Sequence, residues 1–123
     1  MPFKRSFFSD YEQASGLQRG QLWDCLTDDE KARLHELGYR PQRRLTRGAM
    51  DYLLEVFPLP DDQTELMPLS KYERQIGLGE GQIWDYLNQE QKDRIVQLGY
   101  RRFRRLPYRV ILYLRSLGFY WDF

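Results

Sequence analysis

The sequence predicts an all-α protein in which two small four-helix modules follow one another and pack together, and an internal repeat is the main reason. Residues 9–57 recur as residues 70–118, a shift of 61 positions that needs no gap. Within each copy, apolar residues recur at helical spacing, and glycine or proline separates the helical segments. Each copy has about 50 residues, a size at which a lone core is marginal, so we expect the copies to share one.

The chain divides into three parts on this basis. Residues 1–57 form a first helical repeat with an aromatic N-terminal extension, and residues 69–123 form a second repeat with an aromatic C-terminal tail. Residues 58–68, with three prolines and an acidic run, are predicted to be a short, stiff linker. We interpret the aromatic ends as caps on the modules; the alternative is a contact surface through which the chain self-associates.

The first two helices of each copy are short. Ser9 and Ser70 are candidate N-caps of the first helix, since a serine oxygen can accept a hydrogen bond from a free amide of the first turn. A glycine-rich turn then leads into a second helix, whose apolar face includes Trp23 in one copy and Trp84 in the other. We interpret both tryptophans as structural core anchors rather than as platforms for stacking bases.

The third helix has the clearest start. Thr27 and Glu30 fit a capping box, in which each side chain satisfies the other residue's backbone amide, and Asn88 and Gln91 repeat the arrangement.

The third helix ends at a glycine in both copies. Gly38 and Gly99 are predicted to adopt the left-handed conformation that stops a helix. An arginine-rich loop follows, and Thr46 or Pro107 opens a fourth helix that closes the core.

Composition argues against catalysis, metal binding and cofactors. The chain has 123 residues, a net charge of +1, one histidine and one cysteine. His35 is replaced by Val96 in the second copy, so a catalytic or zinc-binding role is disfavoured. Cys25 is replaced by Tyr86, which favours a buried structural thiol. With no membrane span and no secretory signal, we expect a cytoplasmic protein.

In each copy a glycine-containing turn leads from one short helix into the next, as GLGEGQIWDYLN at residues 77–88 and GLQRGQLWDCLT at residues 16–27. These segments look like the turn and recognition helix of a helix-turn-helix, a DNA-binding motif, and the resemblance covers about 20 residues of each copy. The resemblance implies a tandem pair of helix-turn-helix-like domains with DNA as a partner.

Arginines gather in the loop between the third and fourth helices of each copy. They are Arg40, Arg43, Arg44 and Arg47 in the first copy, and Arg101, Arg102, Arg104, Arg105 and Arg109 in the second. Guanidinium groups suit phosphate or a guanine edge, and the interleaved rings of Tyr39, Tyr100, Phe103 and Tyr108 could stack on bases. The alternative is that some of them, Arg40 and Arg101 above all, hold the third helix in place.

Asp24 and Asp85 follow the tryptophans and are interpreted as structural. Each could cap the third helix or pair with Arg40 or Arg101.

These observations predict a non-enzymatic nucleic-acid-binding protein that uses the paired arginine loops. The alternative is a protein adaptor or assembly factor that binds acidic partner surfaces through the same arginines and through its aromatic ends.

Overall fold

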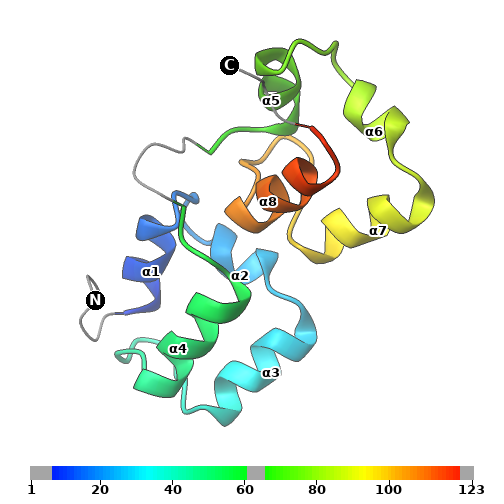
Figure 1. Ribbon diagram of the computed structural model, residues 1–123. Coiled ribbons are helices and arrows are strands. Elements are labelled where there is room, and N and C mark those ends of the chain that lie inside the picture. Colours follow the sequence, from blue (N-terminus) through cyan, green and yellow to red (C-terminus); the bar gives the residue numbers. More distant parts are fainter. Residues whose placement is uncertain (1–6, 61–65, 120–123) are drawn as a thin grey trace.

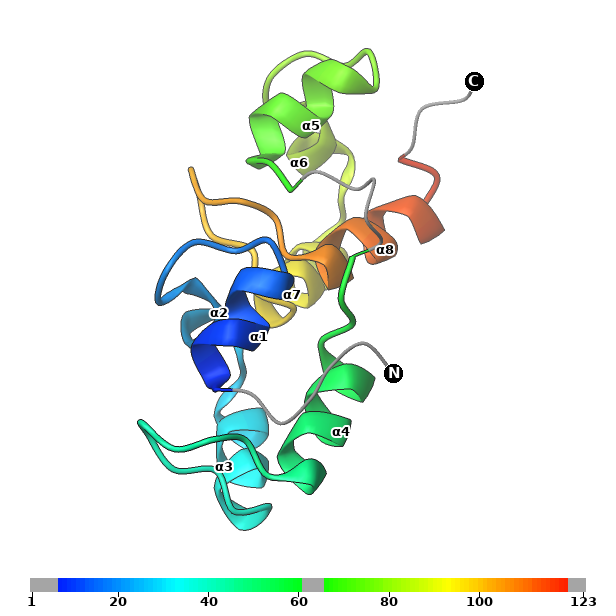
Figure 2. The ribbon, with the colours of Figure 1, turned by 90° about the vertical axis from the view of Figure 1, so that its left-hand side faces the viewer.

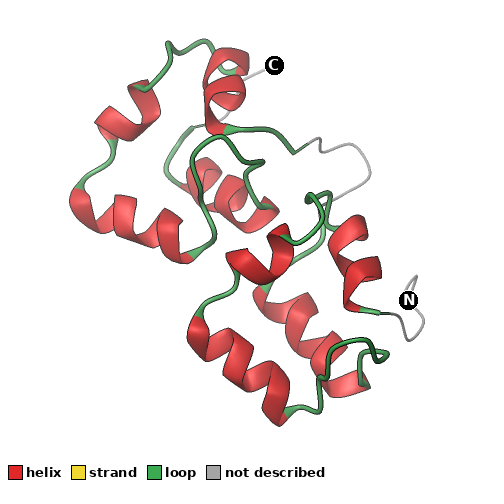
Figure 3. Ribbon diagram, turned by 180° about the vertical axis from the view of Figure 1, so that it is seen from behind, coloured by secondary structure: helices red, strands yellow, loops and turns green. Residues whose placement is uncertain are grey.

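The computed structural model describes residues 7–60 and 66–119, and these residues form eight helices and no strand (Figures 1 and 3). The helices are α1 (Phe8–Ala14), α2 (Gln21–Cys25), α3 (Asp28–Glu36), α4 (Arg47–Val56), α5 (Leu69–Gln75), α6 (Gln82–Tyr86), α7 (Gln89–Gln97) and α8 (Tyr108–Ser116). The all-α prediction is confirmed. No helix within the described ranges is both long and apolar enough to cross a membrane.

The helix boundaries follow the 61-residue offset of the sequence. Helices α5, α6 and α7 begin and end 61 residues after α1, α2 and α3, and α8 begins 61 residues after α4 and is one residue shorter. We refer to residues 7–60 as the N-terminal half and to residues 66–119 as the C-terminal half. In Figure 1 they lie at the lower left and the upper right.

Side-chain caps fix the start of α3 and of α7. The hydroxyl oxygen of Thr27 accepts a hydrogen bond from the amide of Glu30 at 3.1 Å, and the amide of Thr27 donates to the Glu30 carboxylate at 2.8 Å. Asn88 and Gln91 make the same pair of bonds, at 2.8 and 2.9 Å. Both predicted capping boxes are therefore confirmed.

The prediction that Ser9 and Ser70 are N-caps is wrong, because each serine lies inside the first turn of its helix. Phe7 is the N-cap of α1, and its amide donates to the Asp10 carboxylate at 3.0 Å. Pro68 is the N-cap of α5 and has no amide hydrogen that needs a partner.

Two buried glutamates hold α2 and α6 in place. The Glu12 carboxylate accepts the amide of Leu22 at 3.0 Å. The Glu73 carboxylate accepts the amides of Gly81 and Ile83, at 3.1 and 2.7 Å. The first amides of a helix have no intrahelical acceptor, so these carboxylates satisfy them inside the protein. Neither glutamate was expected in this role from the sequence.

Gly38 and Gly99 adopt the left-handed conformation that was predicted, with φ of +98° and +115°. Gly99 is also a site of close approach between the halves, since a Cβ atom there would lie 2.8 Å from the Cβ of Cys25. Cys25 is a free, buried thiol, as expected. Burial raises the pKa of its thiol to about 11, and nearby arginines, with Arg109 foremost, only partly offset this rise.

One buried guanidinium joins the two halves. Arg109, in α8, donates from Nε to the Leu98 carbonyl at 2.7 Å, while Nη1 and Nη2 donate to the two carboxylate oxygens of Glu30 at 2.6 and 3.0 Å. Nη1 also donates to the carbonyl of Val56 at 2.9 Å, and Nη2 to that of Cys25 at 2.8 Å. A guanidinium has five N–H donors. The five bonds therefore use all of them.

Further contacts surround this junction. The Phe57 ring lies 4.6 Å from the Arg109 guanidinium carbon, which suits a cation–π contact. The Gln21 side chain, which is fully buried, donates to the carbonyl of Arg105 at 2.6 Å. Buried apolar side chains of the described residues form one cluster with members from both halves. Arg109 itself is 7% exposed, so little of its side chain is open to solvent.

The linker and the aromatic ends are described only in part. Leu66 and Met67, at the end of the predicted linker, are buried, and the Met67 carbonyl accepts the amide of Leu106 at 2.8 Å. Residues 61–65 lie outside the described residues, as do Phe3, Tyr120, Trp121 and Phe123 of the aromatic ends.

The Arg109 junction predicts a large effect of Arg109→Met on stability. The change removes the Arg109 donors from the Glu30 carboxylate and from three carbonyl oxygens, so we expect the free energy of unfolding to fall by about 3–5 kcal/mol. Urea unfolding followed by circular dichroism measures this. Arg47→Met is the control, because that side chain is 93% exposed and its removal should cost no more than about 0.5 kcal/mol. Equal losses of unfolding free energy in Arg109→Met and Arg47→Met would contradict the conclusion that Arg109 stabilises the junction between the halves.

Because the Glu30 carboxylate is paired in the folded protein, we expect acid to lower the stability of the protein partly through this one group. Burial raises the pKa of its carboxyl, but the hydrogen bonds from Arg109 and Thr27 outweigh burial and hold the pKa below its ordinary value. Glu30 therefore contributes stability above its ordinary pKa, and this contribution disappears as the pH falls through the lower, folded value. Urea midpoints across acidic pH should fall more steeply in the native protein than in Glu30→Gln. If the urea midpoints of the native protein and of Glu30→Gln fell in parallel with pH, the Glu30–Arg109 pair would not contribute to the pH dependence of stability.

Candidate functional site

The two arginine-rich connections project from the same edge of the molecule. Figure 2 shows the α3–α4 connection, residues 37–46, and the α7–α8 connection, residues 98–107, along the left edge of that view. The α1–α2 connection, residues 15–20, lies between them. Nη1 of Arg105 donates to the carbonyl of Gly16 at 2.9 Å, which ties the second arginine loop to this middle connection.

Both loops make the same turn. Gln42 and Phe103, which occupy equivalent positions, have left-handed backbones with φ of +64° and +69°. This conformation is uncommon for any residue other than glycine and is costly for a bulky one.

Arg40 and Arg101 support the end of the preceding helix. Arg40 donates from Nη1 to the carbonyls of His35 and Tyr39, at 3.2 and 2.7 Å. Arg101 makes the equivalent bonds at the end of α7, at the same distances. These bonds fit the scaffold alternative considered for the two arginines, with carbonyl oxygens as the acceptors rather than acidic side chains.

Five exposed arginines remain on the loops and at the start of α4. We call them the arginine face: Arg43, Arg44, Arg47, Arg102 and Arg105. Arg47 lies 4.0 Å from Asp51 across a solvated contact. Among the described residues, the other members of the face have no carboxylate within 4.0 Å.

The structure places Arg104 and Arg109 apart from the arginine face. Arg104 is half-buried and pairs with Asp24 of the other half at 3.3 Å. Arg109 is used within the junction. We therefore leave both out of the binding surface.

Of the four aromatic residues that the sequence places among the arginines, Phe103 alone is exposed. Its side chain is 80% exposed, and the guanidinium carbon of Arg102 lies 4.8 Å from its ring centroid. Tyr39 is buried, while Tyr100 and Tyr108 are half-buried against the core. Of these four rings, Phe103 is therefore the one that can stack on a flat ligand.

The tryptophans and aspartates predicted to be structural occupy different environments. Trp23 and Trp84 are half-buried against the core cluster. Asp24 pairs with Arg104 rather than with Arg40, and Asp85 is exposed.

Sequence reasoning missed one basic residue on this side of the molecule. Arg19 is exposed in the α1–α2 connection that lies between the two arginine loops. Its equivalent in the second copy is Glu80, so the repeat gave no reason to group it with the arginine clusters.

Within the described residues, no three histidine, cysteine, aspartate or glutamate side chains come together in a way that could hold a metal ion. No known family model matches the chain, and no curated protein or solved structure does so either. What the arginine face binds is therefore inferred from the chain's own residues.

Because Phe103 has a left-handed backbone conformation, we expect this residue to lower the stability of the fold. We expect Phe103→Gly to raise the free energy of unfolding by about 0.5 kcal/mol, because the strain of a bulky left-handed residue exceeds the entropic cost of glycine. Chemical denaturation of the variant measures this. Gln42→Gly tests the same backbone position in the other half. A loss of stability only in Phe103→Gly would mean that the ring stabilises the fold.

Proposed function

We propose that this chain is a non-enzymatic nucleic-acid-binding protein whose arginine face contacts the phosphate backbone. The observation that carries the proposal is that the two arginine-bearing connections lie along one edge of the molecule (Figure 2) and that the arginines of the arginine face are exposed. Phosphate contacts by arginine supply most of the affinity of nonspecific nucleic-acid binding.

We further propose that the two halves are copies of one helix-turn-helix-like module. The recurrence of structural contacts at the sequence offset supports this view. Buried Glu12 and Glu73 accept amides of the second helix in each half, and Arg40 and Arg101 donate to the end of the third. Duplication gives the chain two arginine loops with the same turn.

The arginine loops are better suited to phosphate than the helices that resemble recognition helices. Helices α2 and α6 have five residues each, and they carry Asp24 and Asp85, whose charges repel phosphate. The loops carry guanidinium groups with free donors. The exposed Phe103 ring beside Arg102 adds a surface on which an unpaired base can stack, which favours nucleic acid over an acidic protein.

Neutralising the arginine face should weaken binding and its dependence on salt. We expect Arg43→Gln, Arg44→Gln and Arg102→Gln together to lower affinity for a mixed-sequence oligonucleotide by about tenfold or more at low salt. The slope of log affinity against log salt should fall by about 2 to 3. Fluorescence anisotropy across a salt series, on single strands and duplexes, measures both.

The matched control removes the same charge elsewhere, through Arg33→Gln, Arg74→Gln and Arg94→Gln in α3, α5 and α7. This control should bind almost as the native protein does. Equal losses in the two triple variants would reduce the effect to net charge and overturn the assignment of the face. A native protein that binds polyglutamate but no oligonucleotide at low salt would favour the adaptor alternative.

A further inference from the structure

The two halves contain the same aromatic arrangement at equivalent positions. In the N-terminal half, the rings of Trp23 and Tyr39 lie 5.6 Å apart with 34° between their planes. In the C-terminal half, Trp84 and Tyr100 lie 5.5 Å apart with 32° between them. A lysine ammonium also lies 5.3 Å from each tryptophan ring. The two sites can therefore be compared group by group.

The sites differ in what packs against these rings. In the N-terminal half the Phe8 ring lies 5.8 Å from the Trp23 ring and 5.4 Å from the Tyr39 ring. The equivalent residue in the C-terminal half is Leu69, which has no ring to place there.

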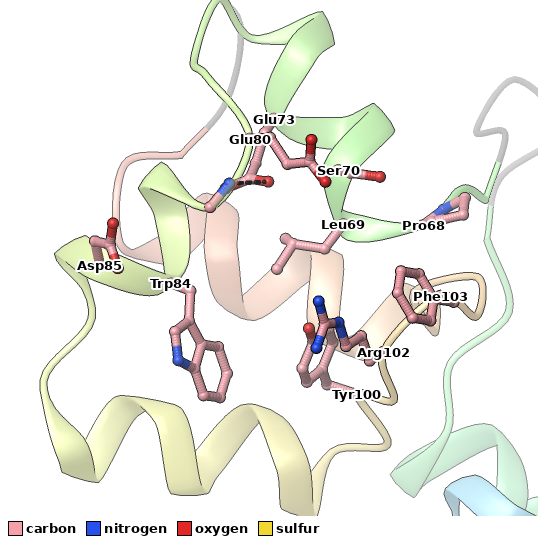
Figure 4. Close-up of a pocket in the computed structure, with 11 residues that line it drawn as sticks. Pro68, Leu69, Ser70, Glu73, Glu80, Trp84, Asp85, Tyr100, Arg102 and Phe103 are labelled. Carbon is pink, nitrogen blue, oxygen red and sulfur yellow. Dashed lines mark hydrogen bonds between the residues drawn. The ribbon is translucent and has the colours of Figure 1, made fainter.

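A cavity of about 450 Å³ lies beside Leu69, Trp84 and Tyr100, and Arg102 and Phe103 also line it (Figure 4). Its volume is within the range of sites that take small ligands or short peptide segments. Phe8 shows from within this chain that such a tryptophan–tyrosine pair accepts a phenyl ring.

Charge at the cavity selects among aromatic ligands. Glu80 and Asp85 line it and are exposed, and Arg102 is the one cation among its lining residues. The guanidinium carbon of Arg102 lies over the Phe103 ring. Glu73 also lines the cavity, although its carboxylate is buried and accepts two backbone amides. The side of the cavity that carries Glu80 and Asp85 therefore attracts a cation and disfavours phosphate.

We propose that this cavity binds an aromatic side chain of a partner protein, with a lysine or arginine next to it in the partner sequence. The ring takes the place beside Trp84 and Tyr100 that Phe8 holds beside Trp23 and Tyr39. The neighbouring cation lies against Glu80 and Asp85. The site adjoins the arginine face, because Arg102 belongs to both, but its carboxylates give it the opposite charge preference. The inference does not depend on nucleic-acid binding.

The test is an NMR titration of the full chain with acetyl-Phe-Lys-amide, following the indole N–H signal of Trp84, which is identified by its loss in Trp84→Phe. We expect a saturable shift. Leu69→Phe fills the cavity as Phe8 fills its counterpart and should weaken binding by at least about tenfold. Leu112→Phe is the matched control, because Leu112 is an exposed residue of α8 that does not line the cavity. It should leave binding unchanged.

Charge selectivity gives a second test that remains valid if Leu69→Phe does not fold. Acetyl-Phe-Glu-amide should bind about threefold to fivefold more weakly than acetyl-Phe-Lys-amide. Glu80→Gln with Asp85→Asn should abolish this difference, and both positions are exposed.

Several results would overturn the proposal. One is the absence of a saturable shift of the Trp84 signal. Another is a response unaffected both by Leu69→Phe and by the paired charge changes. Tighter binding of uridine monophosphate would assign the cavity to a nucleobase. Concentration-dependent self-association in sedimentation, abolished by Leu69→Phe, would assign it to a second copy of this chain.

Discussion

The buried guanidinium of Arg109 fixes how the two halves meet, and the placement of the second arginine loop depends on it. Arg109 lies in the first turn of α8, directly after that loop, and all its N–H groups donate to acceptors in the fold. A buried charge is costly unless every donor is satisfied in good geometry. Shifting one half against the other would take the Arg109 donors away from the Glu30 carboxylate and from the carbonyls of Val56 and Cys25. The junction therefore accepts few alternative arrangements.

Arginine side chains have three different roles in this protein. The role of each arginine depends on which acceptors its guanidinium group meets in the fold. Arg109 is sealed in the junction by a carboxylate and three carbonyls. Arg40 and Arg101 each donate to one carbonyl in the last turn of a helix and to one just after it, and both residues are exposed. The arginines of the arginine face are exposed on the surface of the protein. The arginine face thus contains the arginines that the fold leaves available for binding. The net charge of +1 does not reveal this face, because acidic residues elsewhere in the chain balance its charge.

Much of the local structure could be predicted from sequence, because it depends on residues close together along the chain. The capping boxes of α3 and α7 and the glycine stops follow from neighbouring residues. The serine caps failed because each first helix begins one residue before its serine. Contacts between the halves could not be predicted from the sequence of one copy. Some of the positions at which the two copies differ nevertheless lie at these contacts. Arg109 has Gly48 as its equivalent, and buried Cys25 has exposed Tyr86, because each copy meets a different neighbour.

The most direct test of this account is amide chemical-shift mapping of the full chain during titration with a short mixed-sequence oligonucleotide at low salt. We expect the amides of Arg40, of residues 42–47 and of residues 101–105 to shift together, with a common midpoint, because the junction holds both loops on one edge. The junction itself, around Arg109, should show little change. Shifts confined to one loop, or centred on α2 and α6, would contradict the claim that the two loops form a single binding face.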